Sequence, residues 1–279
     1  MKILLHTAPF LTELAKHFSV IHNVVSWSHE VKPALDLFYE FKPDIFVPQI
    51  SSLNRATLKA IAKYTPQLVV YADVLPNVAN RQILKNLGQA HLFASNQKIA
   101  DAWGCTCLPP AANILEYGNA KVDESLMCEI AIATGFQEGM QEYVWPLVKK
   151  YNIKIFGDKP WPAIPEYLGN VDAPTTANLY CSAKITLLFS REVSDQVFNV
   201  TVANGPPVVC NGDYGEFNKY VMSANSVDEI IQRVEKRDTF IAIPIRGENT
   251  YFDRAADIFD MLALDAEATA FRKTSEEYK

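Results

Sequence analysis

The chain has 279 residues, of which 49% are hydrophobic and 21% charged, with 11 glycines, 16 prolines and five cysteines. This is an ordinary globular composition with enough material for a core, and two domains of roughly 120–150 residues fit the length better than one. The net charge of −6 argues against a broad basic surface for non-specific nucleic-acid binding, because that affinity depends on Lys and Arg.

The position of the glycines excludes two kinds of phosphate site. The first glycine is Gly88, and no two glycines anywhere stand in a Gly-x-Gly pair. A Rossmann cofactor fingerprint and a P-loop both need glycines where the backbone approaches phosphate. Any phosphate site in this chain must therefore be built another way.

The sequence shows no pattern of a membrane span or of a signal peptide. No apolar run approaches the roughly 18–20 residues of a membrane span, and the N-terminal residues 1–10 lack the segments of a signal peptide. We therefore expect a cytoplasmic protein without a transmembrane segment.

The five cysteines have no metal or redox spacing and are expected to be reduced and mostly buried. The five histidines are scattered through the first 91 residues, and only His6 falls where a strand should end.

The first half has the pattern of a parallel βα array. Short apolar runs rich in β-branched residues alternate with helical patterns, which indicates strands buried on both faces of a sheet. The expected strands cover residues 2–5, 44–47, 68–71 and 91–94, and the expected helices lie over residues 35–41, 58–62, 77–87 and 97–103. This order predicts a doubly wound sheet.

A second βα array follows a polar stretch at residues 117–125. Its expected strands are 129–134, 153–156, 183–189 and 207–210, and its expected helices lie over 139–151, 175–182, 194–205 and 228–234. The resulting domains are an N-terminal unit, 1–120, and a C-terminal unit, 121–248, followed by a helix at 249–264. Residues 265–279 are polar, and we expect a tail or a frayed helix there.

Ligands in doubly wound sheets bind at the carboxyl ends of the strands. Asp73 is the carboxylate that directly follows an apolar strand of the first half. It is a candidate catalytic base or a ligand for a sugar hydroxyl, and equally a candidate cap of the next turn.

Four segments of the second half carry a resemblance. They are residues 168–171 (LGNV) with 180–187 (YCSAKITL), residues 194–199 (SDQVFN), residues 203–209 (ANGPPVV) and residues 248–254 (ENTYFDR). In their order and spacing they resemble the carboxy-terminal domain of the CgeB-like glycosyltransferases, which are related to the group-1 glycosyltransferases. The resemblance covers roughly residues 126–262.

This resemblance implies a fold and an activity. The fold is GT-B, an α/β architecture of two Rossmann-like doubly wound domains facing a cleft, in which a C-terminal helix crosses back to the first domain. The activity is hexosyl transfer from a UDP- or GDP-sugar, bound by the second domain, to a glycan or protein-linked glycan held by the first. The nucleotide sugar is then a substrate, and no cofactor is required.

Candidate site residues follow from this reading. Arg191 could offset charge on the leaving diphosphate, and Asp73 could act as the base. The helix that begins near Asp195 offers free N–H groups and a positive dipole end to a diphosphate. Expected donor contacts come from Gly135, Gly157, Lys159, Val171, Asp195, Gln196 and Asn199.

The sequence also departs from the group pattern. The group's ribose-binding glutamate falls at Val200 when counted back from Gly205, and Asn199 takes its place only in a register shifted by one residue. Glu192 has the spacing of the group's other glutamate in the Val200 register. Gly135 is followed by Phe, Gln and Glu, where the group has Arg and Lys.

Other functions remain open on the sequence. No Asp-x-Asp motif is present, so a metal-dependent GT-A enzyme is disfavoured. The alternatives are a nucleotide-sugar epimerase or hydrolase of the same fold, a degenerate GT-B subunit that only binds, and a two-domain binding protein of periplasmic type.

Overall fold

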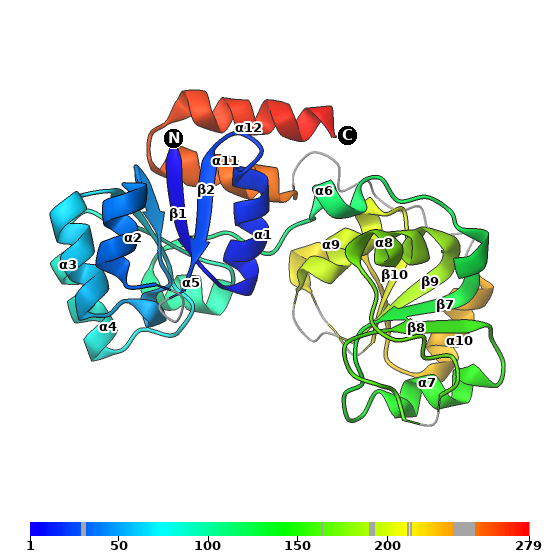
Figure 1. Ribbon diagram of the computed structural model, residues 1–279. Coiled ribbons are helices and arrows are strands. Elements are labelled where there is room, and N and C mark those ends of the chain that lie inside the picture. The colour runs from blue at the N-terminus through cyan, green and yellow to red at the C-terminus, as the bar shows by residue number, and fades with distance from the viewer. Residues whose placement is uncertain are drawn as a thin grey trace. The chain divides into compact units, whose positions relative to one another are not determined.

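A computed structural model describes residues 1–28, 32–162, 164–189, 193–210, 212, 214–236 and 249–278. The chain divides into two compact units. The first comprises Met1–Pro110 with Tyr251–Glu277, and the second comprises Ala111–Thr250. Each is described on its own below (Figure 1).

The first unit is built on a parallel sheet of six strands in the order β2-β1-β3-β4-β5-β6. The strands are β1 (Lys2–His6), β2 (Asn23–Trp27), β3 (Ile45–Val47), β4 (Gln67–Tyr71), β5 (His91–Ala94) and β6 (Thr106–Cys107). The helices between them are α1 (Pro9–Phe18), α2 (Ala34–Phe41), α3 (Arg55–Tyr64), α4 (Val78–Leu87) and α5 (Gln97–Trp103). The expected strands and helices of this half are all present. Helix α1 and the two edge strands, β2 and β6, were not expected from the sequence.

One face of this sheet is covered by α2, α3 and α4. Phe38 of α2 and Ile61 of α3 pack into one buried cluster with Leu4, Phe46 and Val70 from the strands. Pro43 follows the end of α2, and Asn54 caps α3 by accepting hydrogen bonds from two backbone N–H groups of its first turn. The βα alternation expected from the sequence therefore produces a buried parallel sheet.

The opposite face is covered by α1 together with two helices from the end of the chain, α11 (Tyr251–Met261) and α12 (Asp265–Glu277), drawn in orange and red in Figure 1. Phe18 of α1 meets Phe259 of α11 and Phe271 of α12 edge-on, with ring centroids 5.6 and 5.7 Å apart. A tail or a frayed helix was expected over residues 265–279, and the structure has a packed helix there whose Phe271 ring is fully buried. The polar composition concealed this because most of the buried positions of α12 are small residues.

A buried histidine links α1 to α11. His17 is fully buried, shares a 2.9 Å hydrogen bond through Nδ1 with the Glu13 carbonyl oxygen, and contacts the Phe252 ring edge-on at 4.8 Å. Burial lowers the pKa of His17 from 6.5 to about 4, because a charged imidazolium would lose its hydration there.

This shift makes the stability of the first unit sensitive to pH. In the unfolded chain His17 takes up a proton below pH 6.5, whereas in the fold it stays neutral until about pH 4. The free energy of unfolding is therefore expected to fall by about 3 kcal/mol between pH 6.5 and pH 4 on account of this residue. Urea denaturation at pH 7 and pH 4 measures it, with His17→Phe as the control. Equal losses in the wild type and His17→Phe would contradict this account.

The second unit repeats the strand order of the first. Its five-stranded parallel sheet has the order β11-β10-β9-β7-β8, so that both sheets place their first strand between their second and third. The strands are β7 (Cys128–Ala133), β8 (Ile153–Phe156), β9 (Ala183–Leu188), β10 (Pro207–Cys210) and β11 (Met222–Ala224). The helices are α6 (Ile114–Tyr117), α7 (Gln141–Val148), α8 (Ala173–Ser182), α9 (Asp195–Val202) and α10 (Val227–Glu235). The four strands expected in this half are present.

Two layers of helices enclose this second sheet. Leu147 of α7 and Ile230 of α10 pack with Ile132 and Ile185 on one face. On the other face Leu179 of α8 packs against the strands. Helices on both faces leave the ends of the strands as the places where a ligand can reach the sheet.

Candidate functional site

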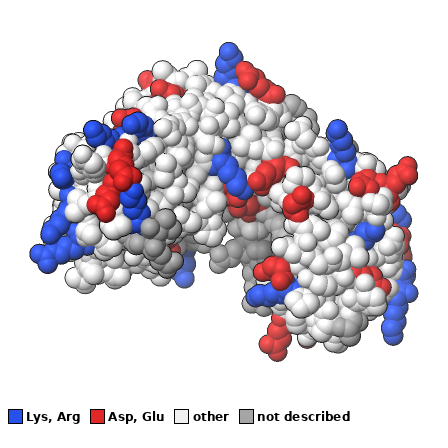
Figure 2. Space-filling view, in the orientation of Figure 1, with Lys and Arg blue, Asp and Glu red and all other residues white. Residues whose placement is uncertain are grey.

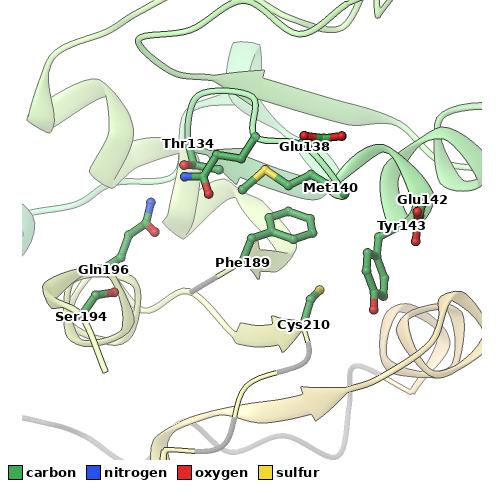
Figure 3. Close-up of a pocket in the computed structure, with 11 residues that line it drawn as sticks. Thr134, Glu138, Met140, Glu142, Tyr143, Phe189, Ser194, Gln196 and Cys210 are labelled. Atoms are coloured by element: carbon green, nitrogen blue, oxygen red, sulfur yellow. The ribbon is translucent and has the colours of Figure 1, made fainter. Parts of the chain in front are cut away.

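A cavity of about 700 Å³ lies at the carboxyl edge of the second sheet. Thr134 follows β7, Phe189 follows β9, and Cys210 ends β10, so three adjacent strands point their carboxyl ends at it. The remaining lining comes from the turn after β7, the start of α7 and the start of α9 (Figure 3). Those residues are Gln137, Glu138, Gly139, Met140, Glu142, Tyr143, Ser194 and Gln196.

The strand order explains why a cavity forms at this place. After β7 the chain turns to one side to form β8, and after β9 it turns to the other side to form β10. The loops that follow β7 and β9 therefore diverge at a topological switch point, which leaves a crevice between neighbouring strands. Thr134 and Phe189 stand on the two sides of this crevice.

Gln196 is the predicted donor-binding residue that lines this cavity. It lies in the first turn of α9, and its side-chain Nε2 donates a 2.6 Å hydrogen bond to the carbonyl oxygen of Ala133, the last residue of β7. Its side chain is also hydrogen-bonded to the hydroxyl of Tyr180, a fully buried residue of α8 whose pKa burial raises. Two contacts thus fix the orientation of the Gln196 amide. The preceding residue, Asp195, is the first residue of α9.

The charge around the cavity is acidic in the part of the lining that the structure describes. Glu138 and Glu142 contribute carboxylates, and no Lys or Arg is among those described lining residues. The backbone N–H groups at the start of α9 carry partial positive charge, and the Ser194 side chain makes no capping hydrogen bond to them. Burial raises the pKa of the Cys210 thiol to about 12, so this thiol is neutral and is a poor nucleophile.

Gly135 and Gly157 lie where two loops of the second unit meet. They bring the loops after β7 and β8 into backbone contact: a Cβ on Gly157 would stand 2.4 Å from the Gly135 nitrogen, and one on Gly135 would stand 2.2 Å from Asp158 Oδ1. Both positions therefore need glycine for the packing of the protein against itself. Neither residue lines the cavity.

Lys159, Val171 and Asn199 also lie away from the cavity lining. Lys159 is exposed, and its carbonyl oxygen accepts a hydrogen bond from Phe136 N. Val171 packs against the buried cluster on the α8 face. Asn199 is only 8% exposed, and its Oδ1 accepts a 2.8 Å hydrogen bond from the backbone N–H of Asn113.

Of the two predicted catalytic residues, the structure describes Asp73 but not Arg191. Arg191 lies outside the described residues, as does Glu192. Asp73 follows β4 in the first unit, where Oδ1 accepts a 3.1 Å hydrogen bond from Ser51 N and Oδ2 accepts a hydrogen bond from Ser51 Oγ. These contacts hold the loop after β3 and orient the carboxylate at the carboxyl edge of the first sheet.

Sequence reasoning missed several residues of the cavity. Glu138, Glu142 and Tyr143 follow the predicted strand end at Gly135, and Phe189 was taken as the last residue of a strand. The signal that could have found them is their position just after β7 and β9, the two strands at the switch point. The rings of Tyr143 and Phe189 meet edge-on, with centroids 6.2 Å apart.

Solved structures share this two-domain fold. HepE from Anabaena in complex with UDP-glucose has a TM-score of 0.57 and 12% identity, over 98% of this chain and 100% of that one. An alpha-glucosyltransferase in complex with UDP-glucose and DNA containing an abasic site has a TM-score of 0.56 and 12% identity, over 96% and 94%. The chain has the two-domain, Rossmann-like GT-B fold.

The GT-B fold is shared by enzymes of another class. UDP-N-acetylglucosamine 2-epimerase from Rickettsia bellii has a TM-score of 0.51 and 11% identity, over 100% of this chain and 97% of that one. No protein-family model matches the chain, and no curated protein matches it in sequence. The GT-B assignment therefore rests on three-dimensional similarity, and it extends over almost the whole chain.

Three further observations bear on partners. Among the described residues, no group of three or more His, Cys, Asp and Glu side chains could hold a metal ion. No described helix has the length and apolar character needed to cross a membrane. On the face shown in Figure 2, blue and red side chains are interspersed over the described surface, without an extended basic patch.

Proposed function

We propose that the chain is a cytoplasmic glycosyltransferase that moves a sugar from a UDP- or GDP-sugar to a carbohydrate acceptor. The observation that carries the proposal is the cavity at the switch point of the second sheet, in a fold whose solved examples include HepE bound to UDP-glucose. Its volume of about 700 Å³ lies in the range that small-molecule ligands occupy.

The cavity offers suitable partners for each part of a nucleotide sugar. The start of α9, at Ser194 and Gln196, presents N–H groups and the positive end of the helix dipole to a diphosphate. Glu138 and Glu142 can accept hydrogen bonds from sugar hydroxyls, and the exposed edges of Tyr143 and Phe189 can contact a base or sugar ring. In this proposal Arg191 supplies the positive charge that the described lining lacks.

The proposed reaction exchanges one C–O bond for another. The bond between the anomeric carbon and the diphosphate oxygen breaks, and the acceptor hydroxyl oxygen forms a bond to the same carbon. The hydroxyl proton passes to a base, for which we propose Asp73, since Ser51 orients its carboxylate at a strand end. The leaving diphosphate is stabilised by Arg191 and the start of α9.

A screen of nucleotide sugars tests this function. The melting temperature of the protein is measured with UDP-, GDP-, ADP- and dTDP-sugars. Any nucleotide sugar that raises it is then assayed for hydrolysis and for transfer of its sugar. At least one UDP- or GDP-sugar should raise the melting temperature, and Arg191→Ala should reduce the effect. Arg233→Ala, an exposed change on α10, serves as the matched control. If none of the nucleotide sugars raises the melting temperature, the proposal is overturned.

Tyr180→Phe removes only the buried hydroxyl that holds Gln196. The variant is expected to bind UDP-glucose about threefold to tenfold more weakly, because the Gln196 amide loses one of its two orienting contacts. Isothermal titration calorimetry measures the change. The Tyr117 ring, which stacks on Tyr180 at 6.0 Å, provides the control Tyr117→Phe. Equal affinities of all three proteins would show that Gln196 needs no support from Tyr180.

Metal independence is a further part of the proposal. Since protein groups and a helix end are proposed to hold the diphosphate, the affinity for UDP-glucose is expected to change less than about twofold when EDTA replaces Mg²⁺. Calorimetric titrations in the two buffers provide the comparison. A loss of affinity in EDTA that Mg²⁺ restores would place a metal ion in the donor site.

An epimerase is the second candidate, favoured by the full-length similarity to the Rickettsia bellii enzyme. The two functions differ in their need for an acceptor. Incubation with UDP-N-acetylglucosamine alone, followed by NMR, is expected to return the substrate unchanged if the chain is a transferase. Appearance of the 2-epimer would instead support the epimerase.

A further inference from the structure

One tryptophan of the second unit lies on the surface. Trp145 of α7 is 48% exposed, whereas Trp27 and Trp161 are 3% and 4% exposed. Exposing so large an apolar ring costs hydrophobic free energy, so a tryptophan held at the surface is a common mark of a binding site.

The Trp145 ring forms one side of a separate hollow of about 610 Å³, which we call the Trp145 groove. Pro146 and Val148 of the same helix continue its apolar surface, and Ile164 closes it from the segment after β8. This wall offers an apolar contact surface.

The rim of the Trp145 groove is polar and balanced in charge. Glu142 supplies a carboxylate, Lys149 supplies an ammonium group, and Gln141 supplies an amide. The side-chain oxygen Oε1 of Gln141 accepts a 2.9 Å hydrogen bond from Gly139 N, which leaves the Nε2 group of this side chain with its N–H donors. The charges of Glu142 and Lys149 offset each other, so the rim favours neither an anion nor a cation. Its hydrogen-bond donors and acceptor suit a neutral ligand rich in hydroxyl groups.

The groove adjoins the proposed donor cavity. Glu142 lines both hollows, and the turn from Gly139 to Glu142, which the Gln141 contact fixes, forms part of the wall of each. Figure 3 shows Glu142 beside Tyr143 at the start of α7. A ligand in the groove therefore binds beside the site proposed for the nucleotide sugar.

We propose that the Trp145 groove binds a sugar ring of a neutral glycan. The C–H face of a pyranose ring stacks on the indole, and the hydroxyls at its edge bond to Glu142, Lys149 and Gln141. The inference rests on the proposed function, since it assumes a chain that handles carbohydrate. It adds a second carbohydrate site on the unit that holds the donor cavity.

Titration with maltohexaose, cellohexaose and chitohexaose, followed by tryptophan fluorescence and calorimetry, tests the groove. At least one oligosaccharide is expected to bind, with an affinity at least tenfold lower in Trp145→Ala and within about threefold in Trp145→Phe, which keeps a stacking ring. Tyr39→Ala, at an exposed aromatic residue of the first unit, is the matched control and should bind as the wild type does. Unchanged melting temperatures exclude misfolding.

Three results would overturn the inference. One is that none of the three oligosaccharides binds, and another is that Trp145→Ala binds them as tightly as the wild type. The third is that the wild type self-associates in sedimentation while Trp145→Ala is monomeric, which would make the groove a contact between copies of the chain. UDP-glucose titrations of the same proteins separate the two proposals: a failed groove leaves donor binding intact, whereas a failed donor site abolishes UDP-glucose binding in every variant.

Discussion

Ser194→Phe is expected to lower the affinity for UDP-glucose on the order of 100-fold and to remove transferase activity. Ser194 stands at the start of α9 on the wall of the proposed donor cavity, where the phenylalanine ring would occupy the space assigned to the diphosphate. A diphosphate displaced from the helix N-terminus loses its N–H partners while remaining desolvated. Each tenfold loss of affinity corresponds to about 1.4 kcal/mol of binding free energy.

The substitution is suited to this purpose because it leaves the helix intact. The Ser194 side chain makes no capping hydrogen bond to α9, so its replacement removes no cap. Ser194→Ala, which deletes the hydroxyl and adds no bulk, is expected to bind UDP-glucose within about threefold of the wild type. Calorimetry gives both affinities. Near-equal affinities of Ser194→Phe and Ser194→Ala would mean that the donor binds elsewhere.

Phe271→Ala is expected to lower the free energy of unfolding of the first unit by about 3–5 kcal/mol. The Phe271 ring is fully buried, stacks on Phe259 at 5.3 Å, and lies edge-on to Phe18. Its removal would leave a cavity among three helices that meet on one face of the sheet. Urea denaturation measures the loss.

Two further variants separate a core helix from a tail. Lys273→Ala, at an exposed position of the same helix, is expected to change stability by less than about 0.5 kcal/mol. Removal of residues 265–279 should expose the Phe18 and Phe259 rings and unfold the first unit. A truncated protein as stable as the full chain would restore the sequence-based view of this segment as a tail or a frayed helix.

The fold was largely predictable because its strands are short, apolar and separated by helix patterns. β8 and β10 were predicted with the bounds that the structure has, and α5 likewise. The strands that escaped prediction, β2, β6 and β11, lie at the edges of the two sheets. β2 is an edge strand with only one fully buried residue, Trp27, so its apolar signal is weak. The helix α12 buries Phe271 as its single large side chain.

The site was harder to predict than the fold. The glycines at strand ends were noticed, but the backbone contact between Gly135 and Gly157 depends on how two loops meet, which composition does not reveal. Asn199 was assigned from a motif in an uncertain register, and the structure shows its side chain bonded to the Asn113 backbone. Gln196, which lines the cavity, was singled out because it belongs to the first turn of a helix at a strand end. Its contact with a donor stays a prediction.

We propose that the cavity of the second unit holds the nucleotide sugar. A crystal structure of the protein with UDP-glucose tests it most directly. We expect the diphosphate at the start of α9, within hydrogen-bonding distance of the backbone at Ser194 or Gln196, with the rest of the donor between the ends of β7 and β9. UDP-glucose bound at any other place on the chain, with this cavity empty, would contradict it.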